Sequence, residues 1–377
     1  MTTSYLNNKK TVILTGSQGF LGTYISKELL DRGYKVVGFD DYSKYGRVTR
    51  PHDNHPNFKL VELNLAENKP DFLSHKPDFI IMAAAKIGGI SYFSKYPATI
   101  FRDNERILAN CYDAIMDIKN KTGEFPKRTV TMSSSMAFEG ADEEFSKLKN
   151  LADMNCCGPQ NFSQDPHKAV WPSKESQVNE YPPPLSSYGR QKLAAEWWAH
   201  AYYAQYKLPF TIVRPFNAVG CYENKAVAEE TVLSGNVELQ LSHCVPDLIH
   251  KCLAGQNPLR IFGAGNQVRS YSNGADIARG IVMAMESPAA INEDFNISTN
   301  ESHTVLELAK LIWERINPSL PFSYESDPAY EHDVQIRQGD TSKAEKLLKF
   351  KALIPLTTSL DEVIEWVRNN IREEIGA

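Results

Sequence analysis

The sequence lacks the features that mark several classes of protein. Its 377 residues carry a formal net charge of -5, so no basic excess indicates a nucleic-acid partner or a membrane surface. No apolar run approaches the roughly 20 residues of a membrane-spanning helix, and residues 1–10 lack the apolar core typical of a signal peptide. We therefore expect a cytoplasmic protein with no nucleic-acid partner and no membrane partner.

Cysteine is present in a pattern that favours neither metal binding nor disulfides. The six cysteines include no CxxC pair and no cysteine–histidine cluster with the spacing of a zinc site. Cys156 and Cys157 are adjacent, which makes them poor candidates for a structural disulfide. The pattern indicates a reduced compartment and predicts no bound metal.

The first half of the chain alternates short apolar strands with helical stretches. Strands are expected at 11–15, 36–39, 58–63, 79–83, 128–132 and 210–214, and helices at 20–30, 98–118 and 187–205. Strands that alternate with helices predict an α/β fold with a doubly wound parallel sheet. Two further amphipathic helices are expected at 304–316 and 359–371.

Three glycines, Gly16, Gly19 and Gly22, lie between the first strand and its helix. Glycine lets the backbone turn tightly and approach a pyrophosphate, and the N-terminus of a helix favours negative charge. The G-x-x-G-x-x-G spacing differs from the usual G-x-G-x-x-G fingerprint, so a plain tight turn is the alternative interpretation. The turn makes the parallel sheet a candidate Rossmann-type sheet.

Asp40 ends the second expected strand, about 20 residues after the turn, where an acid can bond the adenosine ribose. A carboxylate there repels a 2′-phosphate, which favours NAD over NADP. Asp41 ranks below Asp40, because a solvated turn residue is its simpler interpretation.

The pattern also suggests how the chain is divided. We expect residues 1–217 to form the NAD-binding Rossmann domain. Residues 218–377 would form mainly a smaller mixed α/β substrate-binding domain, with a segment near 270–290 returning to the Rossmann domain. Residues 139–187 are polar and proline-rich, and they are too long for an ordinary connection. This insertion is either a lid over the site or a peripheral elaboration.

Tyr188 and Lys192 are four residues apart in a stretch that is expected to be helical. Residues at i and i+4 share one face of a helix. An ammonium group favours phenolate over phenol, so it lowers a tyrosine pKa from its usual value near ~10. The pair could therefore move a proton while a nicotinamide moves a hydride. An ordinary half-buried tyrosine is the alternative.

Taken in their order along the chain, the motifs resemble those of the extended short-chain dehydrogenase/reductase family, in particular those of its NAD-dependent nucleotide-sugar epimerases and dehydratases. The resemblance covers nearly the whole chain. Its pieces are T-G-x-x-G-F-L-G at 15–22, S-S-S at 133–135, Y-x-x-x-K at 188–192, R-x-x-N-x-x-G at 214–220, V-R-S-Y at 268–271 and R-x-G-D-x-S-K-A at 337–344.

The resemblance implies a role for each matching position. Tyr188 would be the base that takes a proton from a sugar hydroxyl, and Lys192 would hold the nicotinamide ribose and lower the tyrosine pKa. Ser135 would hydrogen-bond the reacting oxygen, with Ser134 as the alternative. The residues expected around NAD are Gly16, Gly19, Phe20, Leu21, Gly22, Asp40, Asp41, Ala83, Ala84, Asn104, Tyr188 and Lys192. Those expected around a nucleotide-sugar substrate are Ser134, Asn217, Arg269 and Arg337, with the arginines on the diphosphate.

Departures from the family narrow the implied reaction. Its 4,6-dehydratases carry Thr-Asp-Glu where this chain has Ser135-Met136-Ala137, so the acids that expel water are missing. The 3,5-epimerases carry a cysteine nearest to Met136, and the sugar-acid decarboxylases carry a glutamate near Ala137. Oxidation and reduction at a single carbinol needs none of these groups. The resemblance therefore implies a 4-epimerase that works through a transient 4-keto sugar.

Other interpretations remain open. Residues 83–90 resemble the A-A-x-x-G-G-I of GDP-sugar reductase/epimerases, which supports a net nucleotide-sugar 4-reductase or dehydrogenase and leaves GDP-sugars as possible substrates. A catalytically silent NAD-binding module is the opposing class, although such proteins usually lack the tyrosine or the lysine. The resemblance also implies a homodimer formed through the helices near 98–118 and 187–205.

Overall fold

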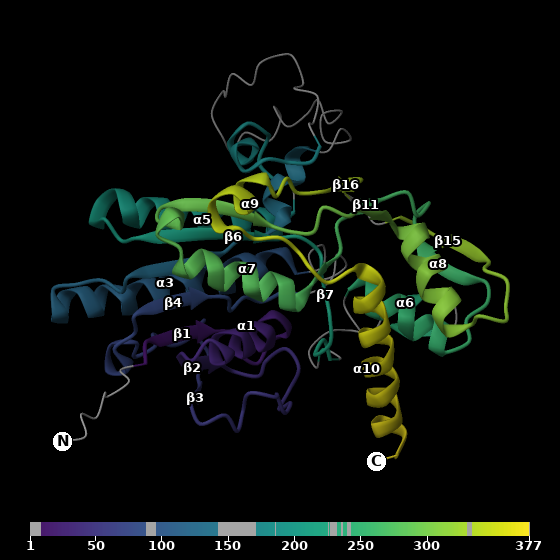
Figure 1. Ribbon diagram of the computed structural model, residues 1–377, viewed down its shortest axis with the longest axis horizontal. Coiled ribbons are helices and arrows are strands. Elements are labelled where there is room, and N and C mark those ends of the chain that lie inside the picture. The colour runs from purple at the N-terminus through teal and green to yellow at the C-terminus, as the bar shows by residue number, and fades with distance from the viewer. Residues whose placement is uncertain are drawn as a thin grey trace.

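The centre of the molecule is a seven-stranded sheet in which all the strand pairs are parallel (Figure 1). The computed structural model describes residues 9–87, 96–141, 171–184, 186–224, 226, 232–234, 237–239, 243–329 and 334–376. The strands are β1 (Thr11–Thr15), β2 (Lys35–Asp40), β3 (Phe58–Glu62), β4 (Phe79–Met82), β5 (Arg128–Met132), β6 (Phe210–Pro215) and β13 (Glu293–Ile297). Their order in the sheet is β13-β6-β5-β4-β1-β2-β3. The doubly wound Rossmann-type sheet predicted from the alternating pattern is confirmed.

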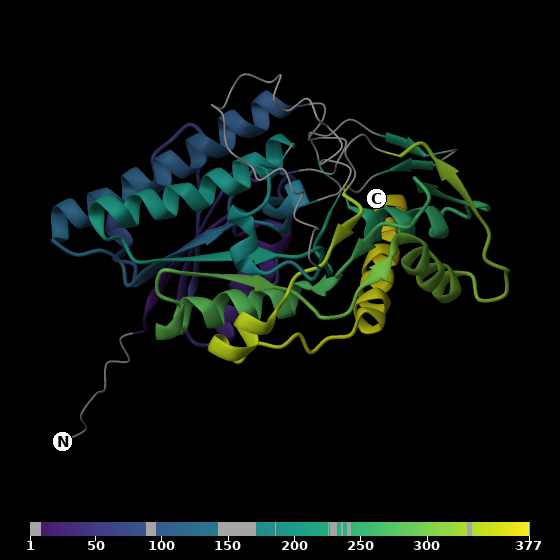
Figure 2. The same cartoon turned by 90° about the horizontal axis from the view of Figure 1, so that it is seen from above.

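Helices cover both faces of this sheet (Figure 2). Helices α1 (Phe20–Asp31) and α7 (Gly274–Glu286) pack on one face, and α3 (Pro97–Thr122) and α5 (Ser187–Tyr206) pack on the other. Successive residues of a strand point to opposite faces, so Val12 of β1 enters the first core and Ile13 enters the second. A strand that is buried on both faces has to be apolar throughout, which explains the continuous apolar runs in the sequence.

Part of the second half of the chain forms a separate core (Figure 1). Helices α6 (Cys244–Leu253), α8 (Val305–Ile316) and α10 (Leu356–Gly376) pack with β10 (Leu259–Phe262), which pairs with β15 (Tyr324–Asp327). The remaining short elements are η1 (Leu73–His75), η2 (Ser135–Ala141), η4 (Glu175–Asn179), β7 (Ala218–Val219), β8 (Val232–Ser234), β9 (Val237–Leu239), β11 (Val268–Arg269), β12 (Ser272–Asn273), η5 (Pro288–Ala290), β14 (His303–Thr304), β16 (Ile336–Arg337) and α9 (Ser342–Leu348).

Several segments from the second half of the chain pack with the large sheet. Helix α7 packs against α1, and β13 and α9 follow it in the chain. Strand β13 pairs with β6 along its whole length, from Glu293 opposite Thr211 to Ile297 opposite Pro215. The sheet therefore ends on a strand from the second half of the chain.

The last part of the insertion is joined to this sheet edge. The Ser173 amide donates to the Gln338 carbonyl at 2.8 Å, and the Asp340 amide donates to the Ser173 carbonyl at 2.8 Å. The buried Glu175 accepts a hydrogen bond from the Asn296 amide at 2.9 Å. Residues 142–170, which make up most of the insertion, lie outside the described residues.

None of the helices in the described ranges is long and apolar enough to cross a membrane.

Candidate active site

The glycine turn is so closely packed that Gly16 and Gly22 leave no room for a side chain. Gly16 has a φ of +74°, and a Cβ there would stand 2.9 Å from the backbone of Ala84. A Cβ on Gly22 would stand 1.9 Å from the Gly16 carbonyl oxygen. The backbone amides of Ala83 and Ala84 both donate to the Thr15 hydroxyl at 3.0 Å, which holds the end of β4 against the turn.

Helix α1 begins directly after this turn, with Gly19 as its N-cap. The first amides of a helix have no partners within the helix, so those of Phe20 and Leu21 are suited to bind an anion. Asp40, the last residue of β2, accepts hydrogen bonds at 2.9 Å from the amides of Gln18 and Tyr42. Its carboxylate therefore lies against the turn.

Asp41 and Asn104, which are also expected near the cofactor, form hydrogen bonds to the protein backbone. Asp41 accepts a bond from the Ser43 amide in an exposed turn, whereas its neighbour Asp40 is buried, which raises the pKa of Asp40. The Asn104 side chain forms two hydrogen bonds to the Lys86 backbone, at 2.6 and 3.0 Å. Asn104 thus fixes the start of the loop after β4. Residues 88–90 of the A-A-x-x-G-G-I resemblance lie outside the described residues.

Tyr188 is the second residue of α5 and is only 6% exposed. Burial raises the pKa of Tyr188 to about 12, while a hydrogen bond with the Ser134 hydroxyl and the charge of Arg337 act in the opposite direction. The Lys192 ammonium nitrogen lies 5.6 Å from the centre of the tyrosine ring and donates to the Met132 carbonyl at 3.0 Å. Burial lowers the pKa of Lys192 to about 8. In the protein alone the tyrosine pKa is thus raised, the opposite of the effect expected from a neighbouring ammonium.

The serine that contacts Tyr188 is Ser134. Its oxygen also accepts a bond from the Met136 amide at 3.2 Å. Ser135, which the family resemblance favours, is buried at the start of η2. The two serines are adjacent, so sequence spacing alone could not determine which hydroxyl meets the tyrosine.

The substrate candidates divide into two groups. Arg337 donates to the Asn217 side-chain oxygen at 3.3 Å, and its charge acts on Tyr188. Arg269 pairs in register with Arg337 across β11 and β16, but its guanidinium donates to the carbonyls of Val268 and Gln335, at 2.9 and 3.2 Å. The structure therefore joins Arg337 and Asn217 to the tyrosine and places Arg269 one strand away.

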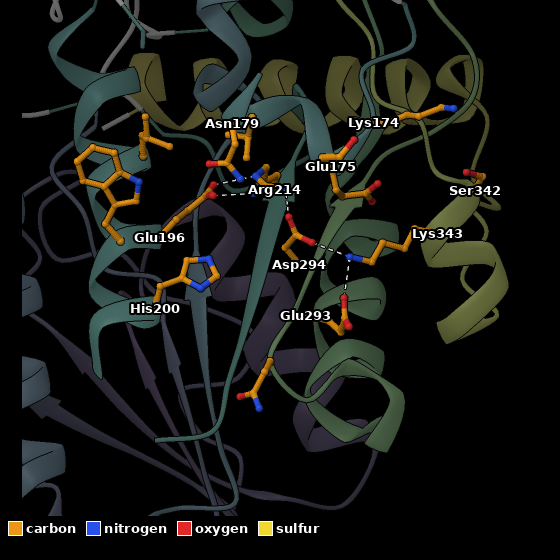
Figure 3. A pocket seen from close by; sticks show the side chains of 15 residues that line it. Lys174, Glu175, Asn179, Glu196, His200, Arg214, Glu293, Asp294, Ser342 and Lys343 are labelled. Carbon is orange, nitrogen blue, oxygen red and sulfur yellow. Dashed lines mark hydrogen bonds and ion pairs between the residues drawn. The ribbon is translucent and has the colours of Figure 1, made fainter. Parts of the chain in front are cut away.

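Sequence reasoning missed a buried ion-pair network behind the tyrosine helix (Figure 3). Arg214 forms a bidentate pair with Glu196, with N–O distances of 2.7 and 2.6 Å, and contacts Asp294 at 2.7 Å. Asp294 continues to Lys343 at 2.6 Å. Glu196 also accepts the Ser133 hydroxyl proton at 2.5 Å. The network lines a pocket of about 520 Å³. The sequence held one signal for it, because Glu196 follows Lys192 by four residues and so shares its face of α5.

Sequence reasoning also missed Glu139, a buried acid close to the tyrosine helix. The Glu139 carboxylate accepts hydrogen bonds from the Ser186 amide and hydroxyl, at 3.2 and 2.6 Å. Ser186 is the N-cap of α5 and accepts from the Gly189 amide at 2.9 Å. Glu139 therefore holds the first turn of the helix that presents Tyr188.

The residues around the glycine turn fit a dinucleotide. The turn needs glycine at Gly16 and Gly22, a helix N-terminus follows it, and a carboxylate ends the neighbouring strand. Fold and site together define a nucleotide-dependent enzyme with a tyrosine–lysine pair.

Comparison with known proteins gives the family. The model of the NAD-dependent epimerase/dehydratase family matches residues 12–298, so the chain belongs to that family, an extended short-chain dehydrogenase/reductase group, and NAD is its cofactor. UDP-glucuronic acid decarboxylase 1 of Danio rerio is 23% identical over 370 residues, which cover 97% of this chain and 75% of the relative.

Two solved structures share the fold. A UDP-glucose 4-epimerase of Thermotoga maritima with UDP-glucose has a TM-score of 0.73 and 24% identity, covering 96% of this chain and 99% of that one. A UDP-glucuronic acid 4-epimerase of Bacillus cereus with UDP-glucuronic acid and NAD has a TM-score of 0.73 and 20% identity, with the same coverage. The chain is therefore an NAD-dependent enzyme of the extended short-chain dehydrogenase/reductase type.

Proposed function

We propose that this protein is a nucleotide-sugar 4-epimerase that acts on a UDP-sugar. The observation that carries the proposal is the arrangement around Tyr188, where Ser134, Lys192 and Arg337 act on the phenol and, among the residues that the structure describes, no second acid–base pair accompanies them. The 4-epimerase structures with the same fold act on UDP-sugars, which makes UDP-sugars the first substrates to test.

The reaction needs one proton acceptor and one hydride acceptor. When bound, NAD supplies the hydride acceptor and later the donor. Tyr188 takes the proton of the C4 hydroxyl as hydride leaves C4, and it returns that proton to the 4-keto oxygen after the sugar has turned. Ser134 hydrogen-bonds this oxygen. Ionisation of a tyrosine whose pKa is about 12 requires nearby positive charge, which Lys192, Arg337 and the oxidised cofactor supply.

The residues after Ser135 argue against decarboxylation and dehydration. Met136 and Ala137 are buried, and Ala137 packs in an apolar cluster with Phe138 and Phe216. The nearest acid in this turn, Glu139, is hydrogen-bonded to the N-cap of α5. No carboxylate at 136–137 is available to act on a second carbon.

A substrate panel tests the proposal. The purified protein is incubated with UDP-, GDP-, CDP- and dTDP-sugars without added cofactor, and the isomers are separated by chromatography. We expect exchange of C4 isomers with no net NADH. A strict requirement for added cofactor would instead identify a net reductase or dehydrogenase. Tyr188→Phe should lower turnover about 100-fold or more and leave NAD bound. Unchanged turnover would refute the catalytic assignment.

We also propose that the protein is a homodimer that pairs through α3 and α5. These helices pack side by side, and they expose Phe101 on α3 and Trp197 on α5, which are 40% and 63% exposed. Large exposed apolar groups on adjacent helices are typical of an interface. Light scattering should give twice the chain mass, and Phe101→Glu should reduce it to one chain. A monomeric wild-type protein would refute the proposal.

A further inference from the structure

Arg50 is a buried arginine beside the glycine turn. It follows β2 in the chain and is only 3% exposed. Its Nε donates to the Gln18 carbonyl at 3.0 Å, and one terminal nitrogen donates to the Asn224 side-chain oxygen at 3.0 Å. The guanidinium carbon lies 5.5 Å from the ring centre of Tyr45 and 5.9 Å from that of Tyr222. Arg50 therefore connects the turn to the segment that follows β7.

This guanidinium has no direct ion pair within the described ranges. Asp53, the nearest acid in sequence, bonds the Arg50 backbone amide at 2.7 Å and the Gln18 side chain at 3.0 Å, and neither bond involves the guanidinium. The second terminal nitrogen of Arg50 has no hydrogen-bond partner in that part of the chain. Burial lowers the pKa of Arg50. A buried cation is unfavourable unless it is paired and fully hydrogen-bonded, as Arg214 is.

We propose that Arg50 binds the adenosine diphosphate half of NAD, with its unpartnered terminal nitrogen donating to a phosphate oxygen. Arg50 is bonded to the carbonyl of Gln18, and the amide of the same residue is bonded to Asp40. The guanidinium thus lies at the adenosine end of the site, close to the helix N-terminus that favours phosphate. Asp40 and Asp53 act on this cation at longer range, and binding the diphosphate gives the guanidinium a counter-charge that is hydrogen-bonded to it.

The substrate diphosphate is a less suitable partner. The arginine whose charge acts on Tyr188 is Arg337, on β16, whereas Arg50 contacts the glycine turn. A 2′-phosphate is also unfavourable, because the Asp40 carboxylate lies against the same turn. The inference depends on NAD being the cofactor and not on the proposed epimerisation.

Arg50→Met tests the inference, with Arg47→Met as the matched control. Arg47 is three residues away, its side chain is 73% exposed, and it pairs with Glu62 at 2.7 Å. Calorimetric titration of NAD-free protein should show that Arg50→Met weakens both NAD and ADP-ribose about tenfold or more, since a charge-assisted bond is lost. Arg47→Met should change neither affinity by more than about twofold.

Thermal unfolding separates binding from a merely structural role. The melting temperature of NAD-free Arg50→Met should equal or exceed that of the wild type, whereas the increase caused by NAD should shrink. A lower melting temperature with an unchanged increase would overturn the inference, as would unaltered ADP-ribose affinity. Arg50→Lys keeps the charge but loses the planar guanidinium group with its several N–H donors, so it should still weaken the affinity for ADP-ribose about threefold or more. If Arg50→Met does not fold, an unchanged affinity in Arg50→Lys overturns the inference.

Discussion

Replacing Lys192 with methionine should change how stability depends on pH. Burial lowers the pKa of this lysine from 10.5 to about 8. Between these values the unfolded chain holds a proton that the folded protein has released, so wild-type stability rises as the pH rises through this window. Below pH 8 the ammonium is charged in both states, and the unfavourable burial is present in full. The methionine variant has no such contribution at any pH.

The size of the effect follows from the two pKa values. Their difference, 10.5 minus about 8, corresponds to about 3 kcal/mol of unfavourable burial at neutral pH. Integrating the proton linkage from pH 7 to pH 9.5 recovers about 2 kcal/mol of this. The hydrogen bond from Lys192 to the Met132 carbonyl is also lost in the variant. That loss is nearly independent of pH, so it cancels when two pH values are compared.

Urea unfolding of the NAD-free proteins measures the prediction. The free energy of unfolding of the wild type, relative to Lys192→Met, should increase by about 2 kcal/mol between pH 7 and pH 9.5. The exposed Lys351, replaced by methionine, controls for the loss of a surface charge. Parallel pH profiles for the wild type and Lys192→Met would show that the lysine is solvated in the folded protein, and the reasoning would then be wrong.

Three further experiments test the site. Arg214→Met should destabilise the protein by about 3–5 kcal/mol in urea unfolding, because it leaves the buried Glu196 carboxylate without a cation; a loss below about 1 kcal/mol would contradict this. Ser134→Ala should lower kcat more than Ser135→Ala, and the reverse order would show that the tyrosine–serine bond does not identify the catalytic hydroxyl. Gly22→Ala should abolish NAD binding, because its Cβ would stand 1.9 Å from a carbonyl oxygen. Gly33→Ala strains the backbone at a φ of +84° but meets no atom within 4 Å, so it should keep NAD; equal NAD affinities would refute the packing argument.

Local sequence signals predicted the nucleotide-binding part of the fold well. The expected strands at 11–15 and 128–132 coincide with β1 and β5, because strands buried on both faces are apolar throughout and end at turns. The glycine spacing identified the turn, since a Cβ does not fit at Gly16 or Gly22. These features depend on neighbouring residues, so a single sequence contains enough information to find them.

Strand β13 could not be predicted in the same way. Its sequence is Glu293-Asp294-Phe295-Asn296-Ile297, in which Asp294 and Asn296 interrupt the apolar pattern. Both polar groups have partners that are distant in sequence, since Asp294 pairs with Arg214 and Asn296 donates to the Ser173 carbonyl at 2.9 Å. An edge strand that satisfies its polar residues through long-range contacts does not show the periodicity on which sequence reasoning depends.

The ion-pair network in the site was missed for the same reason, because its members are distant from one another in the sequence. Glu196 lies one turn after Lys192 on α5, Arg214 begins the R-x-x-N-x-x-G motif, and Lys343 belongs to R-x-G-D-x-S-K-A. Read separately, these two motifs indicated substrate contacts through Asn217 and Arg337, and neither indicated an ion pair with the other. Folded together, they form a continuous series of ion pairs that holds α5 against β6 and β13. Because Glu196 also bonds the Ser133 hydroxyl, next to Ser134, the series fixes the helix relative to the end of β5. The hydrogen bond between Ser134 and Tyr188 spans that same junction of β5 and α5, so its geometry depends on a series of ion pairs that does not include the tyrosine.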